Sequence, residues 1–466
     1  MLIRAAYLLL LAAAVWACNT PSGTSPDTPA ASDAALRSSL DSALTTGLLD
    51  LWYPRCVDSL HGGYFSDFDS VWQQQGPQHK MIVSQARHLW ALSRVAMYMP
   101  ARATLYDSLA AHGYRFLRDA MWDSLYGGFY QLVDREEHTL PTGYGESKRA
   151  YGQAFALYGL AAWAKRSGSP EVLDLARRAF VWLDTHARDS VHGGYWEVLD
   201  RSGRPVTASE AVGMSQATTA GYKDYNSSIH LLEAFAELYQ VWPDSLLGAR
   251  LGEMLVVVRD RQTDPQGYLR LYFTADWQPV SWRDSSRASM EAAHCAWDYI
   301  TPGHDIETAY LLLEAAHVRY GTVDARTLAV ARRMVDHSLA HGYDTLRGGI
   351  FHGIYYYGSD SVPTVFSHNK DWWAQAEALH SLLLFSYIYP DDPQYRRCFS
   401  QQWDYIRRYC LDARHGGWYP LGIDESPHAT GLPKAQIWKT TYHTARALMG
   451  CLKMLDAQAA VPPVAH

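Results

Sequence analysis

The sequence Asp189-Ser190-Val191-His192-Gly193-Gly194-Tyr195 recurs along the chain, and its recurrence decides the fold. An Asp at the start of such a turn can hydrogen-bond the backbone that follows it, and paired glycines supply the positive φ that a tight reversal needs. The aromatic residue after the glycines is typical of a short strand. Similar sequences lie at 58–64, 123–129, 344–350 and 412–418, with a shortened copy at 264–268. Six copies at intervals of roughly 65 to 80 residues indicate a repeat architecture.

Helical periodicity dominates the sequence between these turns. We predict that each outer helix leads into an Asp…Gly-Gly turn and that each inner helix follows the short strand pair and loop after it. The predicted helices span residues 38–52, 84–98, 104–120, 149–166, 170–187, 226–241, 246–260, 304–320, 325–340, 371–388, 393–410 and 441–456. Six such helical hairpins closed into a ring form an all-α (α/α)6 barrel, with short β-hairpins in the loops.

The first 17 residues have the features of a secretory signal, because Arg4 precedes an apolar run that ends at Trp16. The segment Val15-Trp16-Ala17-Cys18 resembles a bacterial lipoprotein cleavage site, with lipidation at Cys18. Plain secretion stays open, since Trp16 stands where such sites have a small residue. We expect an exported protein in the periplasm or cell envelope, linked to a membrane only through a lipid anchor. The predicted segments are a signal peptide at 1–17, a lipid-attached or flexible tether at 18–35, the barrel at 36–458 and a tail at 459–466.

The composition fits a large core and a sugar-binding cleft better than a nucleic-acid surface. The chain is 48% hydrophobic and contains 17 Trp and 31 Tyr, whose flat rings combine an apolar face with a polar edge. A net charge of −7 without a basic stripe argues against nucleic acid as a partner. The five cysteines after Cys18 are odd in number and irregularly spaced, so we expect buried free thiols.

Large polar and aromatic residues cluster where the inner helices begin, although inner helices of a barrel should be apolar and small. In a closed ring all six beginnings face the same mouth. Asn226 and His230 are four residues apart, and His304 and Glu307 are three apart, so each pair shares a helix face. The residues predicted to meet at one cavity are Arg87, Tyr151, Asn226, His230, His304, Glu307, Trp372, Trp373, Trp438 and His443.

Each of these residues also has a structural explanation when it is taken singly. A histidine on a helix is commonly a satisfied core group, and the Trp372-Trp373 pair suits core packing. Arg87 suits a salt bridge with a carboxylate, and Glu307 suits a role in orienting His304 or capping a helix. These explanations do not account for the equivalent positions in successive repeats.

Two histidines on opposite sides of a pocket, with an arginine nearby, suit proton abstraction next to a carbonyl. One base would take the proton from C2 of an open-chain aldose, and the second would return a proton to the other face. Imidazole suits this task because its pKa lies near neutral pH. Positive charge would stabilise the enediolate that forms between the two steps.

The chain resembles the N-acylglucosamine 2-epimerase superfamily, and within it the cellobiose 2-epimerases, from about Ser38 to Leu455. The matching segments are Gln85-Ala86-Arg87, Tyr151-Gly152-Gln153-Ala154-Phe155, Asn226 with His230, Gly303-His304-Asp305-Ile306-Glu307, Trp372-Trp373-Ala374-Gln375-Ala376-Glu377, and Trp438-Lys439 with Tyr442-His443 and Arg446. The resemblance implies an (α/α)6 barrel that needs no cofactor or metal. It further implies C2 inversion at the reducing end of a β-1,4-linked disaccharide.

The resemblance also implies a role for each site residue. His304 and His443 would be the two acid/base groups, and His230 would assist ring opening or proton handling. Arg87 would hold the enediolate oxygens. The remaining residues would bind hydroxyls, orient histidines or form walls: Tyr151, Asn226, Glu307, Trp372, Trp373 and Trp438. Departures from the family pattern at Ser228, Thr301-Pro302, Thr441 and Thr444 are expected at the pocket rim, away from the bases, and they leave cellobiose, mannobiose or a free monosaccharide as substrates.

Several other functions stay open from the sequence. The same site would serve a monosaccharide or N-acylglucosamine 2-epimerase, or an aldose–ketose isomerase. A glycoside hydrolase or lyase would use carboxylates such as Glu307, Asp371 and Glu377. A sugar-binding lipoprotein needs only the tryptophans, and a metal could bind His230, His304, Glu307 and His443. We expect a monomer or weak dimer.

Overall fold

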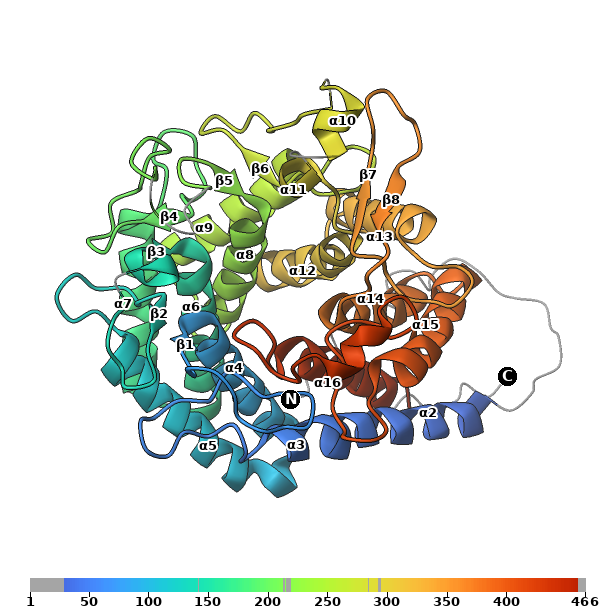
Figure 1. Cartoon of the computed structure of the whole chain (residues 1–466), viewed down its shortest axis with the longest axis horizontal. Helices are drawn as coiled ribbons and strands as arrows, with labels where there is room; N and C mark the ends of the chain where they lie inside the picture. Colours follow the sequence, from blue (N-terminus) through green and yellow to red (C-terminus); the bar gives the residue numbers. More distant parts are fainter. Residues whose placement is uncertain are drawn as a thin grey trace.

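The computed structural model describes residues 29–459, except 141, 213, 215–218, 284 and 292–294. Within these residues two concentric rings of helices surround a common axis (Figure 1). The inner ring consists of α4 (Ile82–Tyr98), α6 (Ala150–Ser167), α8 (Tyr225–Tyr239), α12 (Pro302–Tyr320), α14 (Trp372–Ile388) and α16 (Tyr442–Ala459). The outer ring consists of α2 (Pro29–Leu44), α5 (Ala103–Phe116), α7 (Pro170–His186), α9 (Ser245–Val256), α13 (Ala325–His341) and α15 (Pro393–Tyr405). Contacts between α16 and α4 close the circle, so the predicted (α/α)6 barrel is confirmed.

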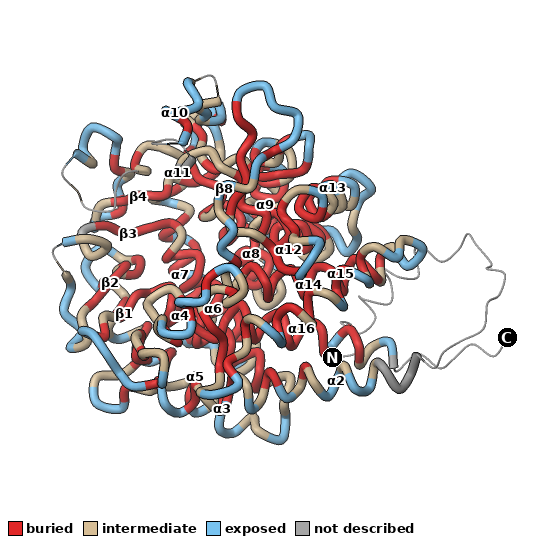
Figure 2. Tube along the Cα trace, turned by 45° about the vertical axis from the view of Figure 1, so that its right-hand side comes forward, coloured by how far each residue is buried: buried red, intermediate tan, exposed pale blue. Residues whose placement is uncertain are grey.

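The inner helices are buried around most of their circumference, whereas the outer helices are buried on one face (Figure 2). In α4 every residue from Ile82 to Ala96 is buried. Small residues make this close packing possible. A Cβ atom added to Gly159 of α6 would lie 2.7 Å from the Ala86 carbonyl oxygen of α4, which is too close for any side chain.

Four two-stranded antiparallel sheets lie at the end of the barrel where the inner helices begin. They pair β1 (Lys80–Met81) with β2 (Leu132–Val133), β3 (Lys148–Arg149) with β4 (Val198–Leu199), β5 (Lys223–Asp224) with β6 (Tyr272–Phe273), and β7 (Gly353–Tyr355) with β8 (Thr364–Ser367). The first three sheets join neighbouring repeats, a difference from the predicted hairpins. The Asp…Gly-Gly turns themselves form single bridges, such as Arg188 with Tyr195, because the turn leaves too few residues for a longer ladder.

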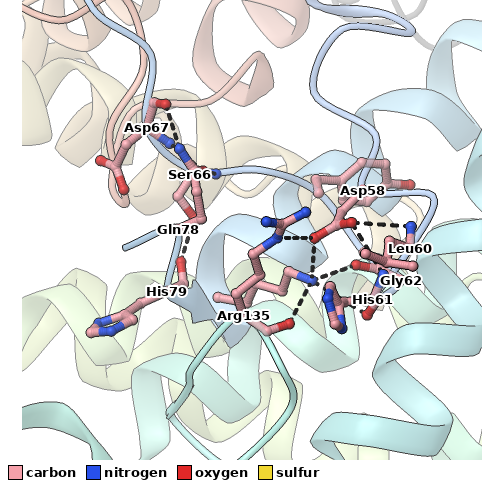
Figure 3. A network of polar contacts seen from close by, with 12 residues as sticks. Asp58, Leu60, His61, Gly62, Ser66, Asp67, Gln78, His79 and Arg135 are labelled. Atoms are coloured by element: carbon pink, nitrogen blue, oxygen red, sulfur yellow. Dashed lines mark hydrogen bonds and ion pairs between the residues drawn. The ribbon is translucent and has the colours of Figure 1, made fainter. Parts of the chain in front are cut away.

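In five of the six turns the Asp is fixed by a buried lysine, a contact that was not predicted from the sequence. Asp58 Oδ1 accepts hydrogen bonds from the backbone N–H groups of Leu60 and His61, both at 3.1 Å, and Arg135 also contacts this carboxylate (Figure 3). Lys80 Nζ lies 3.1 Å from Asp58 Oδ2 and 2.7 Å from the Gly62 carbonyl oxygen. The equivalent pairs are Asp123–Lys148, Asp189–Lys223, Asp344–Lys370 and Asp412–Lys434, whereas Asp264 pairs with Arg270.

A glutamine in the first turn of three inner helices ties the same turn to the barrel. Gln85 accepts a hydrogen bond from the Tyr64 N–H and donates one to the Tyr64 carbonyl, both at 2.8 Å. Gln153 and Gln375 do the same for Phe129 and Ile350. The repeated turn therefore fixes where an inner helix begins, and this determines which side chains reach the mouth.

The start of the barrel differs from the prediction, because α2 begins at Pro29 and includes residues 29–35 of the expected tether. Alanines favour helix here, and ion pairs of Asp33 with Arg396 (2.7 Å) and Arg37 with Asp456 (2.6 Å) hold the helix to the domain. The predicted signal peptide, Cys18 and most of the predicted tail lie outside the described residues. In the described part, no helix combines the length and apolarity that crossing a membrane requires. Cys56, Cys398, Cys410 and Cys451 are buried free thiols, as expected.

Candidate active site

The mouth of the barrel brings the predicted histidines together around Trp373, the second residue of α14. The centroid of the Trp373 ring lies 4.3 Å from that of His304 on α12 and 5.8 Å from that of His443 on α16. His304 and Trp373 are only partly buried, so this part of the mouth is open to a ligand. Two imidazoles from helices on either side of α14 therefore contact one aromatic ring.

His443 is held by a carboxylate. Its Nδ1 lies 2.6 Å from Glu377 Oε1, and Glu377 Oε2 accepts a hydrogen bond of 2.7 Å from the Tyr310 hydroxyl. Beside an ionised carboxylate, Nδ1 carries the hydrogen and donates it. This fixes the tautomer of His443 and leaves Nε2 as the nitrogen that can exchange a proton with a ligand.

His304 is held by hydroxyl groups instead. Its Nδ1 lies 3.0 Å from the Tyr225 hydroxyl and 3.1 Å from the Thr301 hydroxyl. Thr301 therefore contacts one of the proposed bases, which corrects the expectation that the departures from the family pattern lie only at the rim. Ser228 and Thr441 are also not at the rim, since they are buried and hydrogen-bonded to Gln262 and Tyr53.

The pKa values of both imidazoles are well below that of an ordinary histidine. For His304, burial is the main cause, followed by the charges of His230, His352 and Arg87. For His443, burial comes first, followed by Arg87 and Arg446. Both rings are therefore neutral near pH 7, which is the state that a general base requires.

Arg87 brings a positive charge to the mouth without a carboxylate partner. Its Nη2 donates to the Tyr151 hydroxyl at 2.9 Å, and its Nη1 donates to the Trp438 carbonyl at 3.0 Å. Its guanidinium lies 4.3 Å from the centroid of the Phe155 ring. Among the described residues Arg87 forms no salt bridge, so the salt-bridge alternative is wrong and its charge is available to an anionic intermediate.

His230 and the other polar residues line the side formed by α6 and α8. His230 Nδ1 lies 3.0 Å from Glu233 Oε2, and its ring is 5.3 Å from that of Tyr151. The ring of Tyr151 is in turn 6.2 Å from the ring of Trp438. Asn226 Oδ1 is buried and has no hydrogen-bond partner among the described residues, so it can accept one from a ligand.

A buried cluster of charges underlies the histidines. Arg446 forms ion pairs with Glu233, Glu307 and Glu377, and the distance to Glu377 is 2.6 Å. Burial raises the pKa of Glu307 and Glu377, and Arg446 opposes that rise. Burial also acts on Glu233, but Arg446 and His230 outweigh it and hold its pKa at about 2.

One group in this cluster has the geometry of a metal site. The ligand atoms of Glu307, Glu377 and His443 lie within 4.8 Å of one another. Arg446 donates to both carboxylates, however, so a guanidinium already supplies the positive charge that a cation would bring. This set also differs from the predicted one, because it contains neither His230 nor His304.

Two predicted residues are placed differently from the others. Trp372 is 8% exposed, lies in the hydrophobic core, and has Lys439 Nζ 5.6 Å from its ring, which agrees with the core-packing alternative. Glu307 binds Arg446, so it does not hold His304 in the way that the structural alternative expected. No role was predicted for the residues that do hold the histidines and their carboxylates, apart from Glu377 as a hydrolase carboxylate: Tyr225, Glu233, Tyr310 and Arg446. The i,i+3 spacing of His230 and Glu233 was the one local signal among them.

An (α/α)6 barrel whose mouth carries three imidazoles, an unpaired guanidinium and tryptophan rings is the arrangement of a carbohydrate epimerase, an enzyme of the isomerase class. The family model described as N-acylglucosamine 2-epimerase (GlcNAc 2-epimerase) matches residues 63–447, and the chain belongs to this family.

Characterised relatives match over almost their whole length. The chain is 28% identical over 428 residues to a cellobiose 2-epimerase of Bacteroides fragilis, covering 91% of this chain and 99% of that protein. It is 25% identical to a D-mannose isomerase of Marinomonas mediterranea, covering 87% and 94% of the two chains. The solved structure of a cellobiose 2-epimerase from Spirochaeta thermophila superposes with a TM-score of 0.78 at 27% identity, covering 93% of this chain and all of that one.

Proposed function

We propose that this sugar 2-epimerase inverts C2 of the reducing-end aldose in a β-1,4-linked disaccharide of the cellobiose or mannobiose type. The observation that carries the proposal is the contact of His304 and His443 with the same Trp373 ring from different helices. The similarity to cellobiose 2-epimerases supports the disaccharide, because these relatives match over almost the whole chain.

In the proposed reaction, one imidazole removes the proton from C2 of the open-chain sugar. The electron pair of the C–H bond forms the enediolate, and the negative charge that develops on its oxygens is stabilised by Arg87, whose guanidinium pairs with no carboxylate among the described residues. The other imidazole takes up a proton from solvent when the complex forms and delivers it to the opposite face of C2, and the proton removed from C2 is released to solvent from the first imidazole. The configuration inverts and no redox change occurs.

The remaining groups would open the ring and hold the sugar. His230, supported by Glu233, lies next to Tyr151 and is placed to move a proton during ring opening. The Asn226 Oδ1 atom, which has no hydrogen-bond partner in the described part of the chain, would accept a hydrogen bond from a sugar hydroxyl. Trp373 and Trp438 are partly exposed and offer ring faces for stacking against the two sugar units.

An aldose–ketose isomerase is the second candidate, favoured by the similarity to D-mannose isomerases. The same enediolate gives a ketose when the proton returns to C1 and not to C2. A hydrolase is disfavoured, since Glu307 and Glu377 are bound to Arg446 and Asp371 is 2.7 Å from His352. The (α/α)6 fold itself does not decide, because a GH76 α-mannanase of Bacteroides thetaiotaomicron shares it at 11% identity and a TM-score of 0.55.

Incubation with cellobiose in D2O separates these functions. The proposal predicts glucosylmannose with deuterium at C2, detected by NMR. A ketose product would assign the isomerase, and free glucose would assign a hydrolase. Mannobiose and free mannose tested in parallel would rank the substrates by kcat/KM.

A further inference from the structure

Two buried carboxyl groups share one hydroxyl between the start of α6 and the start of α8. Ser227 Oγ forms a short hydrogen-bond contact with Glu197 Oε2 and lies 2.9 Å from Asp224 Oδ2. The exposed fractions of Glu197, Asp224 and Ser227 are 9%, 7% and 4%. A serine hydroxyl has a single hydrogen and can donate to only one carboxylate at a time. The second oxygen–oxygen contact therefore requires a hydrogen on a carboxyl group.

The other contacts of the pair leave room for only one such hydrogen. Asp224 Oδ1 accepts the Ser227 N–H at 2.7 Å, as the N-cap of α8, so its Oδ2 is the atom that faces the serine hydroxyl. Glu197 Oε2 accepts the Tyr151 N–H at 3.1 Å in addition to the serine contact. A protonated Asp224 Oδ2 can thus donate its hydrogen to Ser227 Oγ, and the Ser227 hydroxyl can donate its own hydrogen to Glu197 Oε2.

The charges around the pair favour the retained proton. The guanidinium of Arg149 on β3 is 4.0 Å from Glu197 Oε1, and one cation does not balance two buried carboxylates. The other titratable groups that face the pair are four phenols that are neutral at pH 7: Tyr144 from the 3-10 helix Gly143–Glu146, Tyr151 from α6, Tyr225 from α8 and Tyr272 from β6. Burial raises the pKa of both carboxyls, and the charge of Asp224 raises the pKa of Glu197 further.

We propose that Glu197 and Asp224 hold one proton between them at neutral pH, and that this proton, bridged by Ser227, locks the start of α6 to the start of α8. The inference rests on the proposed function, because the lock positions two substrate-binding residues. Tyr151 follows the strand that leads into α6, and Asn226 lies between Asp224 and Ser227. Loss of the proton at alkaline pH places two negative charges on one hydroxyl. The repulsion separates the two helix starts, so that KM rises while kcat changes less.

The test is Asp224→Asn, whose amide can donate to Ser227 Oγ and accept the Ser227 N–H without any titrating proton. In the wild-type protein, the folded state binds one proton more than the unfolded state above the ordinary carboxyl pKa, so stability falls as pH rises. Tm would be measured from pH 5 to 10 for both proteins. We expect the difference, Tm of D224N minus Tm of the wild type, to increase as pH increases. The alkaline fall in kcat/KM for cellobiose should be less steep in D224N than in the wild type, by up to about tenfold per pH unit, because the shared carboxyl proton no longer contributes to it.

The matched control is Asp244→Asn, because Asp244 caps α9 through the N–H groups of Leu246 and Leu247, and among the described residues it shares no hydrogen bond with a second carboxylate. D244N should keep the wild-type pH dependence of both Tm and kcat/KM.

A Tm difference between D224N and wild type that is constant with pH would overturn the proposal. Should D224N fail to fold, Ser227→Ala provides the decision, since the proposal predicts a raised KM already at neutral pH. An unchanged KM in S227A would refute the lock. Because Tm does not depend on catalysis, the Tm measurements test the shared proton even if the proposed substrate is wrong.

Discussion

The two sides of the barrel mouth differ in how each proposed base is supported. On the α16 side, His443 is buried, its Nδ1 is bound to Glu377, and Glu377 is in turn bound to Tyr310 and Arg446. On the α12 side, His304 is partly exposed and its Nδ1 contacts the hydroxyls of Tyr225 and Thr301. A carboxylate only accepts hydrogen bonds, so it fixes one tautomer of the imidazole and stabilises its protonated form. A hydroxyl can donate or accept, so it determines neither the tautomer nor the protonation state. The two proposed bases therefore differ: the tautomer of His443 is fixed by its carboxylate, whereas the hydroxyl partners of His304 permit either tautomer.

Removing either imidazole should have the largest effect. A positioned acid or base typically contributes about 10²- to 10⁴-fold, so His443→Asn and His304→Asn should each lower kcat for cellobiose by a factor in that range. NMR of the product mixture measures the loss. His138→Asn serves as the control, because this ring is exposed beside Asp134 and should leave kcat unchanged. A fall of less than about tenfold in either site variant would contradict the assigned roles.

The carboxylate on the α16 side should come next. Glu377→Gln replaces a charge-assisted hydrogen bond, worth about 1.5–3 kcal/mol, with a neutral one. We expect kcat to fall roughly tenfold to a hundredfold while the protein stays folded, as circular dichroism would show. If kcat in E377Q equals that of the wild type, the carboxylate does not support the base.

The hydroxyl on the α12 side should matter less. Tyr225→Phe removes one neutral hydrogen bond, worth about 0.5–1.5 kcal/mol, and Thr301 retains its contact with His304. A fall in kcat of roughly twofold to tenfold is expected. Steady-state kinetics of Y225F and E377Q side by side test the contrast directly, and a larger effect of Y225F would reverse the comparison.

The smallest predicted effect is on the acid side of the pH profile. An unperturbed histidine has a pKa of about 6.5 and would halve kcat/KM near that pH when it must be neutral. Because burial and nearby cations lower the pKa of His304 and His443, both rings stay neutral as pH falls through 6.5. We expect no loss of kcat/KM between pH 7 and 6. A fall in kcat/KM with a midpoint at or above pH 6.5 would show that the pKa values of the two histidines are not lowered.

The repeated turn was sufficient to predict the ring, because each copy marks the same point of a helical hairpin. The lysines that hold the turns were not predicted, although Lys80, Lys148, Lys223 and Lys370 each stand two residues before an inner helix. Their partner Asp lies in the preceding turn, and local periodicity does not reveal that pairing.

The support for the histidines depends on closure of the barrel. His443 and Glu377 are 66 residues apart and pair between the neighbouring helices α16 and α14. Arg446 and Glu233 are 213 residues apart and pair across the ring, between α16 and α8. The different positions of the adjacent residues Trp372 and Trp373 could not be predicted from the sequence either. Both have the same side-chain chemistry, and only the rotation of α14 sends one into the core and the other to the histidines.

The central claim is that His304 and His443 act on opposite faces of C2, and hydrogen exchange in D2O tests it most directly. H304N and H443N would each be incubated with cellobiose and, separately, with glucosylmannose, and deuterium at C2 of the recovered starting sugar would be measured. Each variant keeps one base, so we predict that each exchanges only one of the two epimers and that the two variants exchange opposite ones. If one variant abolished exchange of both epimers while the other abolished neither, a single base would serve both faces and the account would be wrong.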